Sequence, residues 1–422
     1  MNVNLAYGQG HLGVEFPDER TTVITPSHKP GLDDERAAVL AALADPIGTG
    51  ALSTWLKPGA KICIAFTDIT RATPNDRIIP WLLRYLADCG VMKSQITLLN
   101  QLGTHRPNTT AELEQMLTPA VVRDYRVENH EPENLEAHVQ FGVTQGGVPA
   151  LINRHLAAAD VRIVTGFIEP HFFAGFSGGP KGIMPGCAAL ETVMSNHSER
   201  QIGDPKAAFG ITVGNPIWDE IRDIALRVGP SFLLNVTLNE TRKITGVFAG
   251  DLLAAHKQGI EFVRGSAMQK VKAPFDIVVT TNSGYPLDMN LYQGVKGMSA
   301  AARIVQERGT IILACECSQG VPAGSPLDKL LRSAGSPEEI LTMLASPGFV
   351  RPEQWQAQIQ ALIQRRAEVL VHSALPDEVI RAAHMTPCRD IALAVSDRLA
   401  ARGPEARVAV LPQGPLTIPY LA

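Results

Sequence analysis

The chain has 422 residues, which is enough for two domains that each have a full-sized core. Its hydrophobic content of 45% and charged content of 19% are those of an ordinary globular protein, and a net charge of −4 gives no electrostatic footprint for nucleic acid or an anionic membrane. No apolar run has the length of a membrane span, the first residues lack a signal-peptide pattern, and six scattered cysteines make no disulfide framework, so we expect a cytoplasmic protein.

The first part of the chain begins with a predicted edge hairpin over residues 1–25 and then alternates strands with helices. Apolar runs predict strands at 61–68, 95–103 and 161–168, and periodic patterns predict helices at 33–43, at 76–87 and from about 109 onward. Each of the three strands delivers polar or charged residues to the loop that follows it. In open α/β sheets ligands gather at that carboxyl edge, so we expect the three loops to converge on one cleft.

A literal G-x-G-x-x-G occurs at Gly8, Gly10 and Gly13. The residues after it, VEFP, do not form a helical pattern, and the dinucleotide-binding fingerprint requires a helix there. We therefore interpret the three glycines as part of a hairpin turn.

The later part of the chain predicts a second α/β unit after a crossing at 270–276. Helices at 215–229 and 250–265 and a hairpin at 232–248 complete the first unit before that crossing. The second unit has expected strands at 276–282, 309–317, 369–375 and 407–414, helices at 298–306, 325–345, 353–366 and 391–402, and a loop at 283–297. The fold class is thus two α/β domains, at 1–268 and 275–404, with the active cleft between them. The last segment, 405–422, is a candidate for a return to the first domain.

A glycine-rich loop between the strand at 161–168 and a helix from Ala188 has the layout of an anion-binding or cofactor-binding loop. Lys181 lies in its middle, where it could donate to a phosphate, bond covalently to a cofactor, or do neither. The loop is not a P-loop, because Lys181 follows Pro180 and precedes Gly182, and the hydroxyl that binds Mg²⁺ is missing.

Several residues also have ordinary structural interpretations. Arg71 could pair with a nearby aspartate, Lys296 could be a solvated helix residue, and Asp288 could cap a helix that begins near Asn290. Trp355 lies on a helical period and is more often core than a cofactor contact. The pair of cysteines at 315 and 317 is better explained by buried thiols than by a metal site.

Four sequence blocks together resemble the nickel-dependent lactate racemase family. They are DITRATP (68–74), GTHRPN (103–108), GFIEPHFFAGFSGGPKGIMPGCAALETVMSNH (166–197) and TNSGYPLDMNLYQGVKGMSAA (281–301). They occur in order over about half the chain. Ala72 is a departure, since the family usually has proline after the arginine.

The resemblance implies a nickel-pincer nucleotide, pyridinium-3,5-bisthiocarboxylic acid mononucleotide Ni, which holds the metal through two sulfurs and a ring carbon. Lys181 would tether it and His197 would be the protein ligand, which suits the planar coordination that Ni(II) favours. The loop 175–182 would lie near its phosphate. Further cofactor-binding positions implied by the resemblance are Ser177, Gly178, Gly179, Asp68, Tyr292 and Trp355. Proteins of cofactor biosynthesis would be partners in maturation.

The same resemblance implies inversion at C2 of a small 2-hydroxy acid, with His105 and His171 as the catalytic pair. Hydride transfer to a pyridinium ring is easier than removal of the weakly acidic C2 proton, and it requires a base for the hydroxyl proton of each enantiomer. Arg71, Lys296 and Gln293 would bind the substrate, the first two through its carboxylate.

Two other classes of function stay open. One is an oxidoreductase from which the 2-keto intermediate escapes, and the other is a non-catalytic protein that binds or stores the nucleotide. The presence of both His105 and His171 disfavours storage, because storage needs no acid/base pair. Which 2-hydroxy acid is the substrate does not follow from the sequence.

Overall fold

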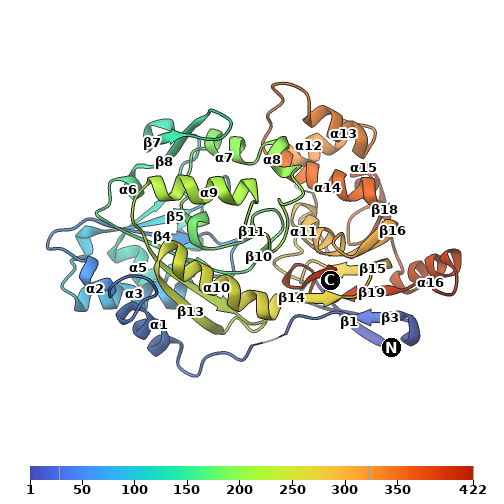
Figure 1. Cartoon of the computed structure of the whole chain (residues 1–422), viewed down its shortest axis with the longest axis horizontal. Coiled ribbons are helices and arrows are strands. Elements are labelled where there is room, and N and C mark those ends of the chain that lie inside the picture. The colour runs from blue at the N-terminus through green and yellow to red at the C-terminus, as the bar shows by residue number, and fades with distance from the viewer. Residues whose placement is uncertain (28, 322–323, 422) are drawn as a thin grey trace. The chain divides into compact units, whose positions relative to one another are not determined.

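The structure, a computed structural model, describes residues 1–27, 29–321 and 324–421. The chain forms two compact units (Figure 1). We call them the central unit, His28–His197 with Ile211–Gly265, and the terminal unit, Met1–Ser27 with Ser198–Gly210 and Ser266–Ala422. Both are α/β, as predicted.

The central unit is built on a six-stranded sheet in the order β13-β12-β9-β4-β5-β6. All neighbours are parallel except the β12–β13 hairpin. The strands are β4 (Ile62–Thr67), β5 (Ile96–Gln101), β6 (Arg126–Asn129), β9 (Val161–Phe167), β12 (Phe232–Leu238) and β13 (Ile244–Asp251). The inner strands are nearly continuous apolar runs, because helices cover both faces of such a sheet.

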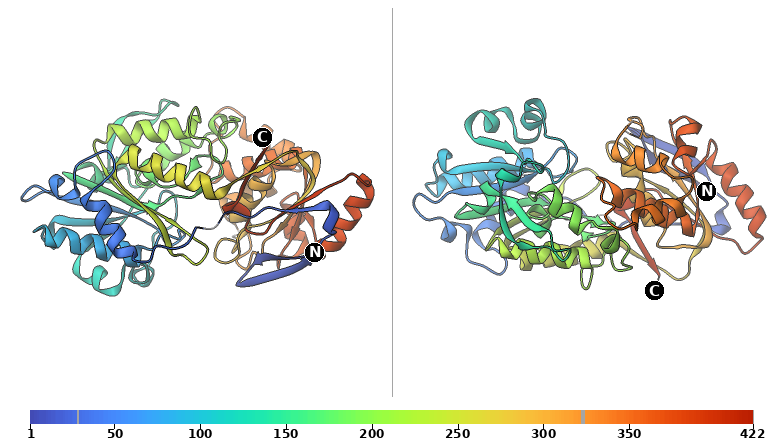
Figure 2. Two further views of the ribbon diagram at one scale, coloured as in Figure 1. Left: turned by 60° about the horizontal axis from the view of Figure 1, so that its bottom comes forward. Right: turned by 90° about the horizontal axis from the view of Figure 1, so that it is seen from above.

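Helices α1 (Glu35–Ala44) and α3 (Asn75–Asp88) pack on one face of this sheet, and α9 (Pro216–Arg227) and α10 (Leu252–Ala267) lie on the other (Figure 2). The remaining helices of the unit are α2 (Leu52–Trp55), α4 (Thr110–Leu117), α5 (Pro119–Asp124), α6 (Arg154–Ala157) and α7 (Leu190–Asn196). Two small ribbons complete it, β7 (His138–Val143) with β8 (Pro149–Asn153) and β10 (Pro170–His171) with β11 (Gly175–Phe176).

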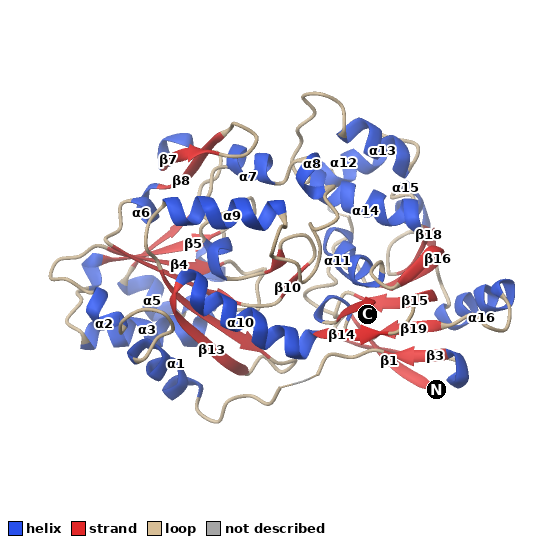
Figure 3. Ribbon diagram, in the orientation of Figure 1, coloured by secondary structure: helices blue, strands red, loops and turns tan. Residues whose placement is uncertain are grey.

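The terminal unit has a second six-stranded sheet, entirely parallel, in the order β18-β17-β16-β15-β19-β3 (Figure 3). Its strands are β3 (Thr21–Val23), β15 (Phe275–Thr281), β16 (Val305–Ala314), β17 (Glu368–His372), β18 (Thr386–Pro387) and β19 (Val408–Leu411). Two further pairs are β1 (Asn2–Tyr7) with β2 (Gly10–Glu15) and β14 (Met268–Val271) with β20 (Ile418–Leu421). The helices are α8 (Glu199–Ile202), α11 (Leu291–Ala301), α12 (Pro326–Arg332), α13 (Pro337–Leu344), α14 (Gln354–Arg366), α15 (Asp377–Ala382) and α16 (Ile391–Arg402).

The chain is divided differently from the predicted 1–268 and 275–404. Strand β3 pairs in parallel with β19, and β19 lies beside β15, so both ends of the chain belong to the terminal sheet. The last strand therefore does not return to the first domain. Val408 and Val410 are fully buried there. A pairing between residues almost 400 positions apart leaves no local signal in the sequence.

Helix α11 begins earlier than predicted. The Asn290 side chain accepts from the backbone N–H of Gln293 at 3.1 Å and caps the helix, so residues 291–297 are helical and not part of a loop. Asp288 is not the cap, because its Oδ2 accepts from the backbone N–H groups of Gly8 and Glu316.

Two other interpretations are confirmed. The glycines at the N-terminus belong to the β1–β2 hairpin: Gly8 lies in its turn with a φ of +51°, Gly10 begins β2, and Gly13 lies within β2. Cys315 and Cys317 are buried thiols, with the Cys317 Sγ donating to the Cys315 Sγ at 3.4 Å. Across residues 1–27, 29–321 and 324–421, none of the helices combines the length and apolar character that a bilayer crossing requires.

Candidate active site

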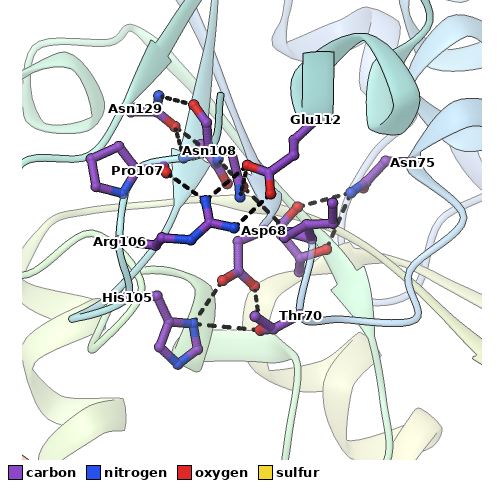
Figure 4. A network of polar contacts seen from close by, with 12 residues as sticks. Asp68, Thr70, Asn75, His105, Arg106, Pro107, Asn108, Glu112 and Asn129 are labelled. Atoms are coloured by element: carbon purple, nitrogen blue, oxygen red, sulfur yellow. Dashed lines mark hydrogen bonds and ion pairs between the residues drawn. The ribbon is translucent and has the colours of Figure 1, made fainter. Parts of the chain in front are cut away.

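The carboxyl edge of the central sheet brings Asp68 and His105 together. Asp68 follows β4 and His105 follows the neighbouring β5, and Asp68 Oδ2 lies 2.7 Å from His105 Nδ1 (Figure 4). The Thr70 hydroxyl donates to the other carboxylate oxygen at 2.8 Å. Burial alone would raise the pKa of Asp68, but the adjacent His105, together with Arg71 and the Thr70 hydroxyl, outweighs the burial and holds that pKa below its usual value.

This pair defines the state of the His105 ring. An ionised carboxylate only accepts hydrogen bonds, so Nδ1 of His105 carries a hydrogen, and in the neutral form of the ring Nε2 presents a lone pair. The imidazole is thereby oriented and ready to accept a proton. Asp68 is thus the hydrogen-bond partner of a catalytic candidate, and its predicted contact with the cofactor stays a prediction.

The two loops that carry this pair are tied together by buried amides. The Asn108 side-chain oxygen accepts from the Ile69 backbone N–H at 3.4 Å and from Asn100 Nδ2 at 2.9 Å (Figure 4). Arg71 lies in the same turn as Asp68, where its backbone N–H donates to the Asp68 carbonyl at 3.1 Å and its charge helps to lower the pKa of that carboxyl.

A second cluster gathers around the ring of Phe173 in the glycine-rich loop. The ring of His171 lies 4.5 Å from it and that of His197 lies 4.9 Å from it, both edge-on, and Lys181 Nζ is 5.8 Å from its centre. The structure therefore brings together three of the residues predicted for cofactor and catalysis. Nδ1 of His171 accepts from the Ala174 N–H at 3.2 Å, so its neutral ring carries hydrogen on Nε2, unlike His105.

The glycines of the loop are required by its backbone. Gly178 and Gly179 have φ of +75° and +56°. A Cβ on Gly178 would lie 2.5 Å from Asn235 Oδ1, and one on Gly179 would lie 2.4 Å from the His256 ring. Ser177 helps to close the loop, because its hydroxyl donates to the Phe167 carbonyl at 3.0 Å.

Two residues that the sequence reasoning missed support this loop from behind. Asn235 Oδ1 on β12 accepts from the Gly179 N–H at 2.8 Å, and His256 Nε2 on α10 lies 2.8 Å from the Ser177 carbonyl oxygen. The His256 ring stacks on Trp218 with centroids 5.2 Å apart. No motif marks these residues, since they come from elements far from the loop in sequence.

His197 suits a single-imidazole metal ligand. It is 4% exposed, and burial together with the charge of Lys181 lowers its pKa to about 3, so the ring is neutral at pH 7. Among the described residues no group of three or more His, Cys, Asp or Glu side chains could hold a metal ion. One neutral imidazole beside one lysine thus fits a cofactor that brings its own donor atoms.

The remaining predicted residues lie in the terminal unit. Trp355 Nε1 on α14 donates to the Tyr292 hydroxyl oxygen on α11 at 3.2 Å, so two residues that were each predicted to bind the cofactor are in contact. Gln293 and Lys296 are on α11, and Lys296 is one turn beyond Tyr292. The predicted cleft between the domains stays a prediction.

Because three of its histidines are buried, we expect the central unit to lose stability at acidic pH. Burial lowers the pKa of His130 and His256 to about 4, and burial with Lys181 lowers that of His197 to about 3, against 6.5 for the ordinary side chain. As the pH falls, the unfolded chain binds these protons before the folded chain does. The stability that the neutral rings contribute is therefore fully present above pH 6.5 and is lost as the pH falls toward 4. Between pH 6 and 5 the three together cost about 4 kcal/mol of unfolding free energy.

Denaturant unfolding at pH 7, 6 and 5 measures this loss. A His130→Gln variant should take up one proton fewer on unfolding and show a correspondingly smaller slope, whatever its stability at pH 7. A free energy of unfolding that stays level from pH 7 to pH 5 would contradict the assignment of neutral buried rings.

The sequence and the fold both match one family. Residues 7–210 match the lactate racemase N-terminal domain family and residues 270–418 match the lactate racemase C-terminal domain family. A lactate racemase of Thermoanaerobacterium thermosaccharolyticum is 33% identical over 98% of both chains, and one of Lactiplantibacillus plantarum is 37% identical over 90% of both.

Solved structures agree with this. The lactate racemase apoprotein of T. thermosaccharolyticum superimposes with a TM-score of 0.93 at 32% identity, covering 99% of this chain and 100% of that one. A Thermotoga maritima protein shares the fold with a TM-score of 0.70 at 21% identity, over 93% of this chain and 100% of that one. This chain therefore belongs to the lactate racemase family of isomerases.

Proposed function

We propose that this chain inverts C2 of a 2-hydroxy acid, with lactate as the first substrate to test. The observation that carries the proposal is the Asp68–His105 pair, 2.7 Å apart at the sheet edge where ligands gather. A buried carboxylate that orients a half-exposed imidazole is the arrangement of a general base. A protein that only stored a cofactor would have no use for it.

The cofactor that we propose is the nickel-pincer nucleotide, tethered by Lys181 with His197 as metal ligand. When bound, it would supply a hydride acceptor, so that a 2-keto acid forms transiently from the substrate. The loop of Gly178 and Gly179, with Ser177 closing it, would lie near its phosphate. We further propose that Tyr292 and Trp355 contact it, that dedicated biosynthetic proteins deliver it, and that the enzyme works in the cytoplasm.

The residues of the chain would perform the proton transfer and the binding. His105 Nε2 would take the hydroxyl proton of one enantiomer and hold it on an imidazolium that Asp68 stabilises. His171 would serve the opposite enantiomer. Arg71 would bind the substrate carboxylate as a bidentate fork and Lys296 as a point charge, with Gln293 beside them.

The direct test is chiral inversion. The cofactor-loaded enzyme is incubated with single enantiomers of lactate, malate, a sugar acid and an aromatic 2-hydroxy acid, and the enantiomer ratio is followed to equilibrium. We expect racemisation of at least one acid. Net accumulation of the 2-keto acid without inversion would instead support an oxidoreductase.

A substrate deuterated at C2 tests the hydride route. We expect inversion to be several-fold slower and the product to retain most of its deuterium, because hydride held on a shielded ring does not exchange with water. Mass spectrometry of the product measures the label, and unlabelled substrate in D₂O is the matched control. Rapid loss of the label to water during inversion would exclude hydride transfer.

A further inference from the structure

Two buried residues outside the predicted site, Asn196 and Glu220, lie directly behind His197. Asn196 is the last residue of α7 and is fully buried, and Glu220 lies on α9 with 2% of its surface exposed. Asn196 Nδ2 donates to Glu220 Oε2 at 2.8 Å and to the Ile217 carbonyl oxygen at 3.3 Å. The other Glu220 oxygen accepts from the Gln145 backbone N–H.

These contacts determine which way the Asn196 amide points. Both partners of its nitrogen are acceptors, a carboxylate and a carbonyl, so the NH₂ group must face them. The amide oxygen is then the atom that lies 3.0 Å from His197 Nδ1.

The amide in turn determines the state of the His197 ring. An amide oxygen can only accept, so the hydrogen of the neutral ring is on Nδ1 and the lone pair is on Nε2. The Phe173 ring packs edge-on against His197 at 77° and restricts its rotation.

We propose that Glu220 and Asn196 are positioning residues that hold His197 in the tautomer whose Nε2 can bind a metal. The inference rests on the proposed function in one respect, namely that His197 is the nickel ligand. We call the hydrogen bonds that link Glu220, Asn196 and His197 the series. A carboxylate suits the far end of the series because it has no hydrogen to donate, so the direction of donation along the series cannot reverse. Ligating histidines commonly donate their other ring nitrogen to such a partner, and its loss typically costs 10- to 100-fold in metal affinity.

The tautomer can be read without any cofactor. In ¹⁵N-histidine-labelled apoprotein at pH 7, long-range ¹⁵N–¹H spectra distinguish a protonated from an unprotonated ring nitrogen, and His197→Gln identifies the signals of His197. We expect protonated Nδ1 in the wild type and a shift of the hydrogen toward Nε2 in Asn196→Leu and in the isosteric Glu220→Gln. Ser195→Ala is the matched control, because it removes the 2.7 Å contact with Thr144 from the same helix and leaves the series intact.

The second readout is nickel release from the loaded enzyme in the presence of a chelator. We expect release to be 10- to 100-fold faster in Asn196→Leu and Glu220→Gln than in the wild type and in Ser195→Ala. If Glu220→Gln leaves both the tautomer and the release rate unchanged, the positioning role is overturned, even where Asn196→Leu fails to fold. If the tautomer shifts but His197→Gln itself keeps its nickel, the positioning stands and the ligand assignment of the proposed function fails.

Discussion

Replacing His105 with glutamine should lower the rate of chiral inversion by about 10²–10⁴-fold, the usual contribution of a general base, while the loaded enzyme keeps its nickel. Glutamine retains polarity and approximate size but cannot take up a proton. The fold should tolerate the change, because the His105 side chain is 33% exposed and lies in a loop. The initial rate of inversion and the nickel content of the same preparation are the two measurements.

Asp68→Asn is a second test of the role of His105. An asparagine can turn its NH₂ toward His105 Nδ1, which would move the ring hydrogen to Nε2 and block proton uptake there. We expect a loss comparable to that of His105→Gln, and little additional loss in the double variant, since the two act as one unit.

His155→Gln is the matched control for these variants. His155 lies on α6, which precedes β9, whereas the candidate site follows the carboxyl ends of the strands. Its replacement should leave the inversion rate unchanged. If His105→Gln retained more than a tenth of the wild-type rate at full nickel content, His105 would not be the base.

Lys181→Ala and His197→Ala should each lose nickel to background levels after purification from a host that makes the cofactor. Both side chains lie around the Phe173 ring, and His197 is held neutral by burial and by the lysine charge. Removing either one takes away an attachment that the proposed cofactor requires, so activity should disappear with the metal. Metal analysis measures the loss of nickel, and the mass of the intact protein measures the loss of the covalently attached cofactor.

Lys181→Arg separates a covalent tether from a simple cation. Arginine keeps a positive charge that can bind a phosphate but cannot replace the ε-amino group in a covalent bond. We expect Lys181→Arg to lose the covalent mass increment together with the nickel. Lys257→Ala, which changes an exposed lysine on α10, is the control and should retain both. Full nickel content and activity in Lys181→Ala would refute the assignment.

The sequence alone determined those parts of the fold whose signals are local. Strand β4 was recognisable because a strand of a covered parallel sheet is apolar along its whole length, and α16 coincided with its predicted bounds because Asp390 caps it and a periodic run fills it. The polar blocks after β4, β5 and β9 were also recognisable from local sequence, because each follows its strand directly. The family resemblance came from these blocks as well.

Tertiary structure decided everything that depends on partners far apart in the chain. The assignment of β3 and β19 to one sheet, the pairing of Asp68 with His105 and the support of the loop by Asn235 and His256 are all non-local contacts. Asn196 and Glu220 illustrate the reason most clearly. Their importance lies in which hydrogen-bonding atom faces which neighbour, and that is determined only when α7 and α9 pack together.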